Sequence, residues 1–330
     1  MNCVLLGTST LAIPTAEALL KLFPPFPMGG GARGGGLVGI ITKPTEPAGR
    51  KHAPTPPPVA VWAAEHGVPL HQPSTKSELT TTLRALQPDA AIVIAYGQMI
   101  PGDALTIPRF GFVNIHPSLL PKYRGPSPVQ AAIANGDSET GVTLILLDAQ
   151  MDHGPILAQE RMSISPTATR SQLDRELAEL GARLLERTLP NYLAGTVAPR
   201  PQDDSTATTT PLLSRDHGRI DWHDSAAAIA RKVRAYEDWP GTWAMFPSPS
   251  HSPSEDGEKV VVGRRLKILA AAVGGTTSES SGTIALSPDN LNVACGDGRL
   301  LTLLTVQPEG KPAMDGKAFR IGHQSIKVLA

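Results

Sequence analysis

The sequence predicts a doubly wound, Rossmann-like α/β domain followed by a smaller β-rich domain. Three observations lead to this fold class. A length of 330 residues suits two domains or one large one. Short apolar runs alternate with helical patterns through the first half of the chain, as they do in α/β folds. In the last third, short apolar runs follow one another at close spacing, which indicates a small barrel or sandwich.

Nearly continuous apolar runs predict the strands of the first domain. Uninterrupted burial of this kind is typical of a parallel sheet that helices cover on both faces. The predicted strands are residues 4–6, 38–41, 90–95, 112–115 and 142–147.

Helical patterns separate these runs, at residues 14–20, 58–66, 78–86 and 128–134. The last of them has Ser127 as a candidate N-cap, Pro128 in its first turn and Asn135-Gly136 as its stop signal. A longer helix follows, and leucines spaced three or four residues apart give it one apolar face: Leu173, Leu177, Leu180 and Leu184. We interpret this helix as a packing element without chemistry.

A segment rich in Pro, Asp, Ser and Thr, residues 198–210, has the composition of a linker. We therefore place the first domain at residues 1–204, a linker at 205–213 and the second domain at 214–330. A short helix at 225–236 opens the second domain. Its predicted strands are residues 242–246, 260–262, 266–269, 282–286, 291–294 and 300–306.

Two low-complexity stretches interrupt the pattern. Residues 29–36 are rich in glycine, and residues 247–254 are rich in proline and serine. Both have the composition of flexible insertions between elements, and we expect neither to carry chemistry.

The overall composition excludes several classes of protein. Thirty basic residues balance thirty acidic ones, so no basic excess indicates a nucleic-acid binder, and RNA contacts would have to come from local patches. Two cysteines, Cys3 and Cys295, do not make a disulfide framework. The first residues read as a β-strand without a charged leader, and no apolar stretch approaches the ~20 residues of a membrane span. We therefore expect a soluble cytoplasmic protein with free thiols.

Familiar cofactor and nucleophile motifs are missing from the sequence. Gly7-Thr8-Ser9-Thr10 follows the first strand but lacks the G-x-G-x-x-G spacing, which disfavours a nicotinamide or flavin site. There is no G-x-x-x-x-G-K-[ST] phosphate loop and no G-x-S-x-G elbow. His and Cys residues do not cluster at zinc spacing, so we expect no metal.

The candidate catalytic groups are Asn114, His116 and Asp152. Asn114 and His116 end one predicted strand, and Asp152 follows the next, at the strand ends where doubly wound sheets bind ligands. Residues two apart point to the same side of a strand, so an amide N–H and an imidazolium can hold one oxyanion. A carboxylate beside the histidine favours its charged form and can relay a proton.

A structural interpretation of the same residues stays open from spacing alone, because Asn-x-His is a common pair and His116 could bond a loop carbonyl. The flanking turn at 118–121, the Arg124-Gly125-Pro126 loop and Asp152-His153-Gly154 favour catalysis. We assign the neighbouring His153 a surface or supporting role.

The chain resembles the folate-dependent formyltransferase family. The resemblance rests on Asn-Ile-His-Pro-Ser-Leu-Leu-Pro at 114–121, Tyr-Arg-Gly-Pro at 123–126 and Met-Asp-His-Gly-Pro-Ile at 151–156. Thr-Lys-Pro at 42–44 with Pro-Ala-Gly-Arg at 47–50 is similar to a first loop of the members that act on methionyl-tRNA. Gly-Arg-Ile-Asp-Trp at 218–222 and the stretch 236–243 resemble the start of their second domain.

The resemblance implies 10-formyltetrahydrofolate as donor, the α-amino group of initiator methionyl-tRNA as acceptor, and a monomer. It implies that Asn114, His116 and Asp152 are catalytic and that the second domain is an OB-like β-barrel that binds tRNA. The residues implied for the folate site are Ser118, Leu119, Leu120, Pro121, Tyr96 and Gly97. Those expected to contact tRNA are Arg50 and its neighbour Lys51, and, as a local basic cluster on the helix of the second domain, Arg231 and Arg234.

Rival interpretations are a purine-pathway or sugar-amine formyltransferase, a formyl-folate hydrolase, and a non-catalytic RNA-binding protein with this fold. The first loop and the domain that begins near Gly218 count against the other formyl-folate enzymes. The intact catalytic residues and the 118–121 turn count against a binding module. The stretches 29–36 and 247–256, and the prolines after Lys51-His52, depart from the family pattern.

Overall fold

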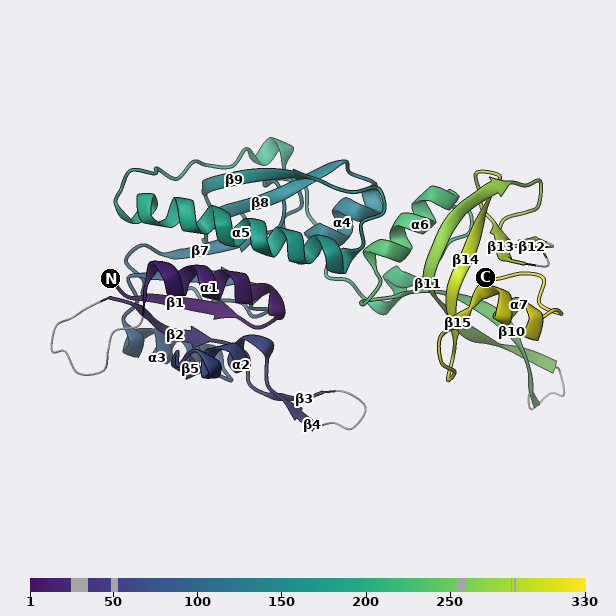
Figure 1. The fold of residues 1–330 in the computed structure, drawn as a ribbon, viewed down its shortest axis with the longest axis horizontal. Coiled ribbons are helices and arrows are strands. Elements are labelled where there is room, and N and C mark those ends of the chain that lie inside the picture. Colours follow the sequence, from purple (N-terminus) through teal and green to yellow (C-terminus); the bar gives the residue numbers. More distant parts are fainter. Residues whose placement is uncertain (25–34, 49–52, 254–258, 286, 288) are drawn as a thin grey trace. The chain divides into compact units, whose positions relative to one another are not determined.

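A computed structural model describes residues 1–24, 35–48, 53–253, 259–285, 287 and 289–330 (Figure 1). These residues form two compact units. Unit 1 comprises Met1–Pro128, Glu139–Ser163 and Leu173–Thr210, and unit 2 comprises Val129–Ser138, Ile164–Gln172 and Pro211–Ala330. Most of the predicted glycine-rich insertion, and residues 254–256 of the second one, lie outside the described residues.

The core of unit 1 is a seven-stranded sheet in the order β5-β2-β1-β6-β7-β8-β9 (Figure 1). Strands β5 to β7 in this order run parallel, which confirms the doubly wound prediction. The strands are β1 (Cys3–Gly7), β2 (Leu37–Ile41), β5 (Leu70–His71), β6 (Ala90–Ile94), β7 (Phe112–His116), β8 (Glu139–Leu146) and β9 (Ile156–Ser163). A separate antiparallel pair, β3 (Glu46–Ala48) and β4 (Ala53–Thr55), extends from the first half.

One edge of this sheet departs from the prediction. Strand β8 pairs antiparallel with both β7 and β9, although its apolar run was interpreted as part of a parallel sheet. A continuous apolar run reports burial on both faces and carries no information about strand direction. Strand β9 was not predicted, because exposed positions recur along its length.

Helices cover both faces of the sheet. In Figure 1, α1 (Ile13–Leu22) and α5 (Arg170–Leu193) lie over one face. Helix α3 (Lys76–Leu86) packs on the other, where Leu79 and Leu83 join Val4 and Leu6 in one core cluster. Helix α2 (Pro58–Glu65) also belongs to unit 1, whereas α4 (Pro128–Asn135) belongs to unit 2 except for its first residue. The predicted leucine face of α5 is buried, as the spacing required.

The strand order reverses between β1 and β6, which places their carboxyl ends side by side. The backbone N–H of Thr8 donates to the Ala95 carbonyl at 3.2 Å, and the Thr8 hydroxyl donates to the Tyr96 carbonyl at 2.9 Å. Such a reversal is the usual position of a ligand in an open α/β sheet. Strand β7 is the next neighbour of β6, so its carboxyl end lies at the same edge.

Unit 2 contains a curled antiparallel sheet in the order β10-β11-β14-β13-β12, with β15 paired to β14, which is the barrel-like domain expected. Its strands are β10 (Thr242–Pro253), β11 (Lys259–Thr276), β12 (Ile284–Ala285), β13 (Leu291–Ala294), β14 (Arg299–Pro308) and β15 (Met314–Asp315). One apolar core joins the sheet to α6 (Ala226–Ala235) and α7 (Gly316–Gly322).

One strand prediction and one insertion prediction in unit 2 were wrong. Residues 260–262 and 266–269 belong to one long strand, because Gly263 and its neighbours continue the pairing with β10. Residues 247–253 were predicted as a flexible insertion, yet β10 continues to Pro253. Composition misled here, because Pro247 and the residues from His251 to Pro253 still pair with β11 across a register shift.

Both cysteines are buried free thiols, as predicted, and burial raises the pKa of Cys3 and of Cys295 to about 12. Within the described ranges, no helix has both the length and the apolar character needed to cross a membrane.

Candidate active site

The site begins on β7, which carries both Asn114 and His116. Two residues apart on one strand, their side chains leave the same face of the sheet. Asn114 is partly exposed, whereas His116 is only 4% exposed. Strand β7 lies between β6 and β8, so pairing on both sides fixes the backbone positions of Asn114 and His116.

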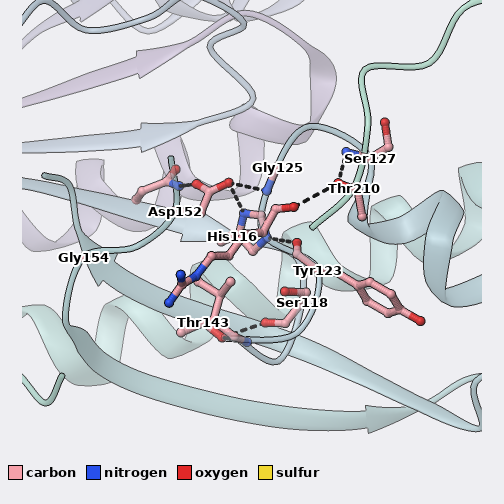
Figure 2. Close-up of polar contacts among 12 residues, drawn as sticks. His116, Ser118, Tyr123, Gly125, Ser127, Thr143, Asp152, Gly154 and Thr210 are labelled. Atoms are coloured by element: carbon pink, nitrogen blue, oxygen red, sulfur yellow. Dashed lines mark hydrogen bonds and ion pairs between the residues drawn. The ribbon is translucent and has the colours of Figure 1, made fainter. Parts of the chain in front are cut away.

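Asp152 reaches these residues from the loop between β8 and β9. Its backbone adopts a left-handed conformation with φ of 50°. One carboxylate oxygen accepts the backbone N–H of Gly125 at 2.8 Å and lies 3.6 Å from His116 Nδ1 (Figure 2). The other accepts from Asn114 Nδ2 at 3.4 Å. The structure therefore brings the three predicted catalytic residues together.

Both ring nitrogens of His116 face oxygen acceptors. Nε2 lies 2.9 Å from the Tyr123 carbonyl, and Nδ1 faces the Asp152 carboxylate (Figure 2). A carbonyl and an ionised carboxylate can only accept, so a ring protonated on both nitrogens satisfies both contacts. The loop-carbonyl contact that spacing left open is thus present together with the carboxylate contact.

The predicted folate turn, residues 118–121, lies directly after His116. The buried Ser118 hydroxyl donates to the Lys122 carbonyl at 2.7 Å, so it closes its own turn. Leu120 is 3% exposed, whereas Leu119 and Pro121 are partly exposed. The exposed edge of the turn is therefore provided by Leu119 and Pro121.

Thr143 on β8 anchors this turn. Its hydroxyl donates to the Ser118 carbonyl at 2.6 Å and accepts the Leu120 N–H at 3.1 Å. Gln159 on β9 donates both to the Thr143 hydroxyl, at 2.9 Å, and to the Leu120 carbonyl, at 2.7 Å. Because Thr143 is directly opposite His116 in the sheet, the turn and the histidine are held by one pair of strands.

Gly125 has a conformation that only glycine readily adopts. Its φ is 105°, and an added Cβ would lie 2.6 Å from the Thr210 carbonyl. Arg124 bonds the backbone of the same segment in both directions: its N–H donates to the Thr208 carbonyl, and its carbonyl accepts the Thr210 N–H, each at 2.8 Å. Residues 208–210, predicted to be linker, thus lie alongside the loop of residues 123–126.

A polar network holds the loop that carries Asp152. The side-chain amide of Gln202 donates to the carbonyls of Asp152 and Gly154, each at 2.8 Å. Its side-chain oxygen accepts from Arg124 Nε at 3.1 Å and Nη2 at 2.9 Å. Arg124 also pairs with Asp204 at 2.7 Å, and this pairing lowers the pKa of that carboxyl. Gln202 therefore ties the Asp152 loop to the Arg124 loop.

His153 extends the network at the surface. Its Nδ1 lies 2.7 Å from the Asp148 carboxylate and its Nε2 lies 3.5 Å from Asp204. The hydrogen bond to Asp148 is the main cause that raises the pKa of His153. The side chain thus supports the loop, in line with the supporting role that the sequence indicated.

Tyr96 and Gly97 follow β6 at the strand-order reversal. The Tyr96 ring is 2% exposed and packs in the core cluster on the α3 face, and burial raises its pKa to about 12. Among the residues that the structure describes, its hydroxyl has no hydrogen-bond partner. Gly97 has φ of 72°, and a Cβ there would meet Lys43 Nζ at 3.0 Å. These residues therefore present backbone, and not the phenol, at the sheet edge.

Of the four residues expected to contact tRNA, the structure describes the two on α6. Arg50 and Lys51 lie outside the described residues. On α6, Arg231 Nε donates to the Ala134 carbonyl at 3.1 Å, and Arg234 Nε donates to the Ala168 carbonyl at 3.2 Å. Each guanidinium group therefore already donates a hydrogen bond to a backbone carbonyl of unit 2.

The described parts of the chain contain no group of three or more His, Cys, Asp and Glu side chains that could hold a metal ion. That the reaction uses no metal stays a prediction.

Sequence reasoning missed Gln202, Thr143 and Thr210. Gln202 and Thr210 lie in the segment whose composition indicated a linker, and composition says nothing about which backbone groups a polar residue bonds. Thr143 could have been found, because it is the polar residue inside the apolar run of β8.

Comparisons with known proteins agree with this geometry. A model described as "Formyl transferase" matches residues 30–189, and "Formyl transferase, C-terminal domain" matches residues 212–324. A relative named methionyl-tRNA formyltransferase from Chloroflexus aurantiacus is 40% identical over 98% of this chain and 97% of its own. One of the same name from Roseiflexus sp. is 45% identical over 87% and 84%, and one from Myxococcus xanthus is 37% identical over 97% and 95%.

Solved structures show the same fold. An N-formyltransferase from Helicobacter canadensis, in complex with folinic acid and dTDP-3-aminofucose, has a TM-score of 0.62 at 15% identity over 93% of this chain and 100% of its own. HypX from Aquifex aeolicus, in complex with tetrahydrofolic acid, has a TM-score of 0.60 at 18% identity over 98% of this chain and 47% of its own. Both domain matches and the full-length relatives show that this chain belongs to the formyl transferase family.

Proposed function

We propose that this protein transfers the formyl group of 10-formyltetrahydrofolate to the free α-amino group of initiator methionyl-tRNA, which gives formylmethionyl-tRNA for translation initiation. The observation that carries the proposal is the cluster of Asn114, His116 and Asp152 at the carboxyl end of β7. The names of the full-length relatives support this acceptor, and folate ligands in structures of the same fold support this donor.

The acceptor amine needs little activation. Model α-amino groups have a pKa of about 7.7–8, so a useful fraction is neutral near pH 7. The site accordingly needs no strong base for the first step. Its main task is to stabilise the negative charge that develops on the formyl oxygen when the amine attacks the formyl carbon.

Asn114 and His116 are the proposed donors to that oxygen. The Asn114 amide contacts Asp152 only at 3.4 Å, a long hydrogen bond that a better acceptor can replace. Asp152 orients His116, and it carries a proton from the new ammonium to the leaving nitrogen, directly or through water. The formyl carbon thereby gains a bond to the acceptor nitrogen and loses its bond to the folate nitrogen.

The donor would lie between the end of β6 and the turn after β7. Gly97 and the backbone of Tyr96 form one side, and the 118–121 turn, with Leu119 and Pro121 at its accessible edge, forms the other. Apolar side chains and backbone polar groups of this kind suit a flat heterocycle. We therefore propose Ser118, Leu119, Leu120, Pro121, Tyr96 and Gly97 as the folate site, with Ser118 and Leu120 shaping the turn.

The tRNA would contact Arg50 and Lys51 in the first loop, Arg231 and Arg234 on α6, and more broadly the domain that we place at residues 214–330. We also propose that the protein acts as a monomer in the cytoplasm. Phosphate contacts of this kind predict an affinity for tRNA that falls steeply as salt rises.

A single assay tests the proposal. Purified protein is incubated with radiolabelled initiator methionyl-tRNA and 10-formyltetrahydrofolate, and formylmethionine is scored after mild ester hydrolysis. Label in formylmethionine that requires the folate supports both substrates. Release of formate from the folate without formylation would keep the catalytic residues and move the protein to the hydrolase interpretation.

A further inference from the structure

Unit 2 contains a cavity of about 330 Å³ that the catalytic site does not include. It lies between the turn after α6, the start of β10, the middle of β11 and the turn after β14. The lining side chains that matter here are Arg215, Trp239, Trp243, Arg265, Lys267 and Glu309. The cavity thus combines indole rings with basic groups.

The basic groups of this cavity have no anionic partner among the residues that the structure describes. Arg215, Arg265 and Lys267 form no ion pair there, although many exposed cations elsewhere in the chain do. Arg265 and Lys267 are two apart on β11 and pair with Met245 and Trp243 of β10. The Arg265 guanidinium lies 4.6 Å from the centre of the Trp243 ring, so this indole face is already covered.

Both acidic side chains that line the cavity, Asp238 and Glu309, already interact with other groups of the protein. Asp238 lies 3.7 Å from Arg170 and accepts from the Ser171 hydroxyl at 3.3 Å. A Glu309 carboxylate oxygen accepts the backbone N–H of Arg265 at 3.3 Å. Three cations therefore face two carboxylates, one of which, Asp238, is also paired with Arg170, so the lining keeps a net positive charge that attracts an anion.

Trp239 supplies a stacking surface beside these cations. It is 48% exposed, and its ring N–H donates to the Leu213 carbonyl at 3.3 Å, which fixes the orientation of the indole. An oriented, half-exposed ring next to unpaired cations is the arrangement with which proteins hold single-stranded nucleic acid: the base stacks and the phosphates meet the cations. Helix α6 contains no aromatic residue, and its two arginines each donate a hydrogen bond to a backbone carbonyl.

From this juxtaposition we infer that the cavity is a binding site for an unpaired nucleotide of the acceptor tRNA. The base stacks on Trp239, and the flanking phosphates contact Lys267 and Arg215. The inference deepens the proposed function, on which it rests, because it names where unit 2 holds the acceptor.

The test measures binding of deacylated initiator tRNA by the full-length protein over a range of salt concentrations. The variants are Trp239→Ala, Trp239→Phe and the double variant Arg215→Ala/Lys267→Ala. Lys327→Ala is the matched control, because Lys327 is an exposed lysine of the same unit that does not line the cavity. Thermal melts check that each variant is folded.

We expect Trp239→Ala to weaken binding about 5- to 150-fold and Trp239→Phe to retain most of the affinity. The double variant should reduce the slope of log affinity against log salt by about 0.7–0.9 for each phosphate that the protein no longer neutralises, and Lys327→Ala should change neither quantity. Folded Trp239→Ala and double variants with the wild-type affinity and salt slope would overturn the inference.

The formylation assay keeps the two proposals separate. If the wild type formylates methionyl-tRNA but the cavity variants bind and react as it does, only the cavity assignment fails. If the wild type formylates no tRNA and binds none, the proposed function fails with it. Tight binding of a protein, with no effect of the variants on RNA, would also overturn the nucleotide assignment.

Discussion

Asp152 is the residue on which the arrangement of the proposed catalytic groups depends. Its carboxylate contacts Asn114, His116 and the backbone of Gly125, while its own backbone is held by Gln202. Each contact comes from a different part of the chain, so the position of one carboxylate reports whether the whole site is assembled.

Loss of either proposed oxyanion donor should slow the reaction strongly. Asn114→Ala and His116→Ala each remove one donor, which typically costs on the order of 10²–10³ in turnover. Single-turnover formylation of methionyl-tRNA measures the effect, and the melting temperature checks folding. Near-normal turnover in either folded variant would remove that side chain from the mechanism.

Gly125→Ala should both destabilise the protein and reduce activity. The new methyl group would meet the Thr210 carbonyl, and a residue with a Cβ is strained at φ of 105°. Gly195→Ala is the matched control, because Gly195 also has positive φ (76°) but an added Cβ meets nothing within 4 Å. Thermal melts and formylation rates of the two variants should therefore separate the effect of backbone strain at positive φ from that of the clash with the Thr210 carbonyl.

The His153 side chain should make stability depend on pH. Its pKa is raised in the folded protein, mainly by the hydrogen bond with Asp148, so its contribution is fully present below the unfolded pKa of about 6.5 and is lost as pH rises through the higher folded pKa. His153→Asn should remove this pH-dependent part of the melting temperature between pH 5.5 and pH 8.5. The effect is small because the group is exposed. A pH profile identical to that of the wild type would contradict the assignment.

At the scale of elements, the extended segment 208–210 lies against the loop of residues 123–126 and helps to hold it. Thr210 donates its hydroxyl to the Arg124 carbonyl and accepts the N–H of Ser127, each at 3.1 Å, and it is 8% exposed. The same loop contributes the Tyr123 carbonyl that His116 contacts. A change at Thr210 therefore reaches the histidine through one short stretch of backbone.

Thr210→Val should lower stability and turnover together. It keeps the shape of the side chain but removes two hydrogen bonds, each worth roughly 1 kcal/mol. Thr209→Val is the control, because Thr209 is exposed and its side chain takes no part in this bonding. Denaturant unfolding and formylation rates give the comparison. Equal behaviour of the two variants would mean that the segment does not position the loop.

At the scale of the whole molecule, the sequence predicted what burial dictates and missed what hydrogen bonding decides. The strands β1, β2, β6 and β7 and the leucine face of α5 followed from apolar patterns. Polar residues at strand ends predicted that Asn114, His116 and Asp152 lie together, which they do; their catalytic role stays a proposal. The direction of β8 and the course of residues 200–210 could not be predicted, because backbone pairing leaves no mark on side-chain type.

The pairing of residues 208–210 with the catalytic loop limits how the gene can be cut or extended. A shortened protein that ends at residue 204, the boundary that composition indicates, would lack Thr208 and Thr210 and would leave Arg124 without its backbone partners. A fusion or insertion placed between Thr208 and Thr210 would interrupt the same contacts. Splitting the protein into separately expressed halves therefore calls for a cut no earlier than Pro211.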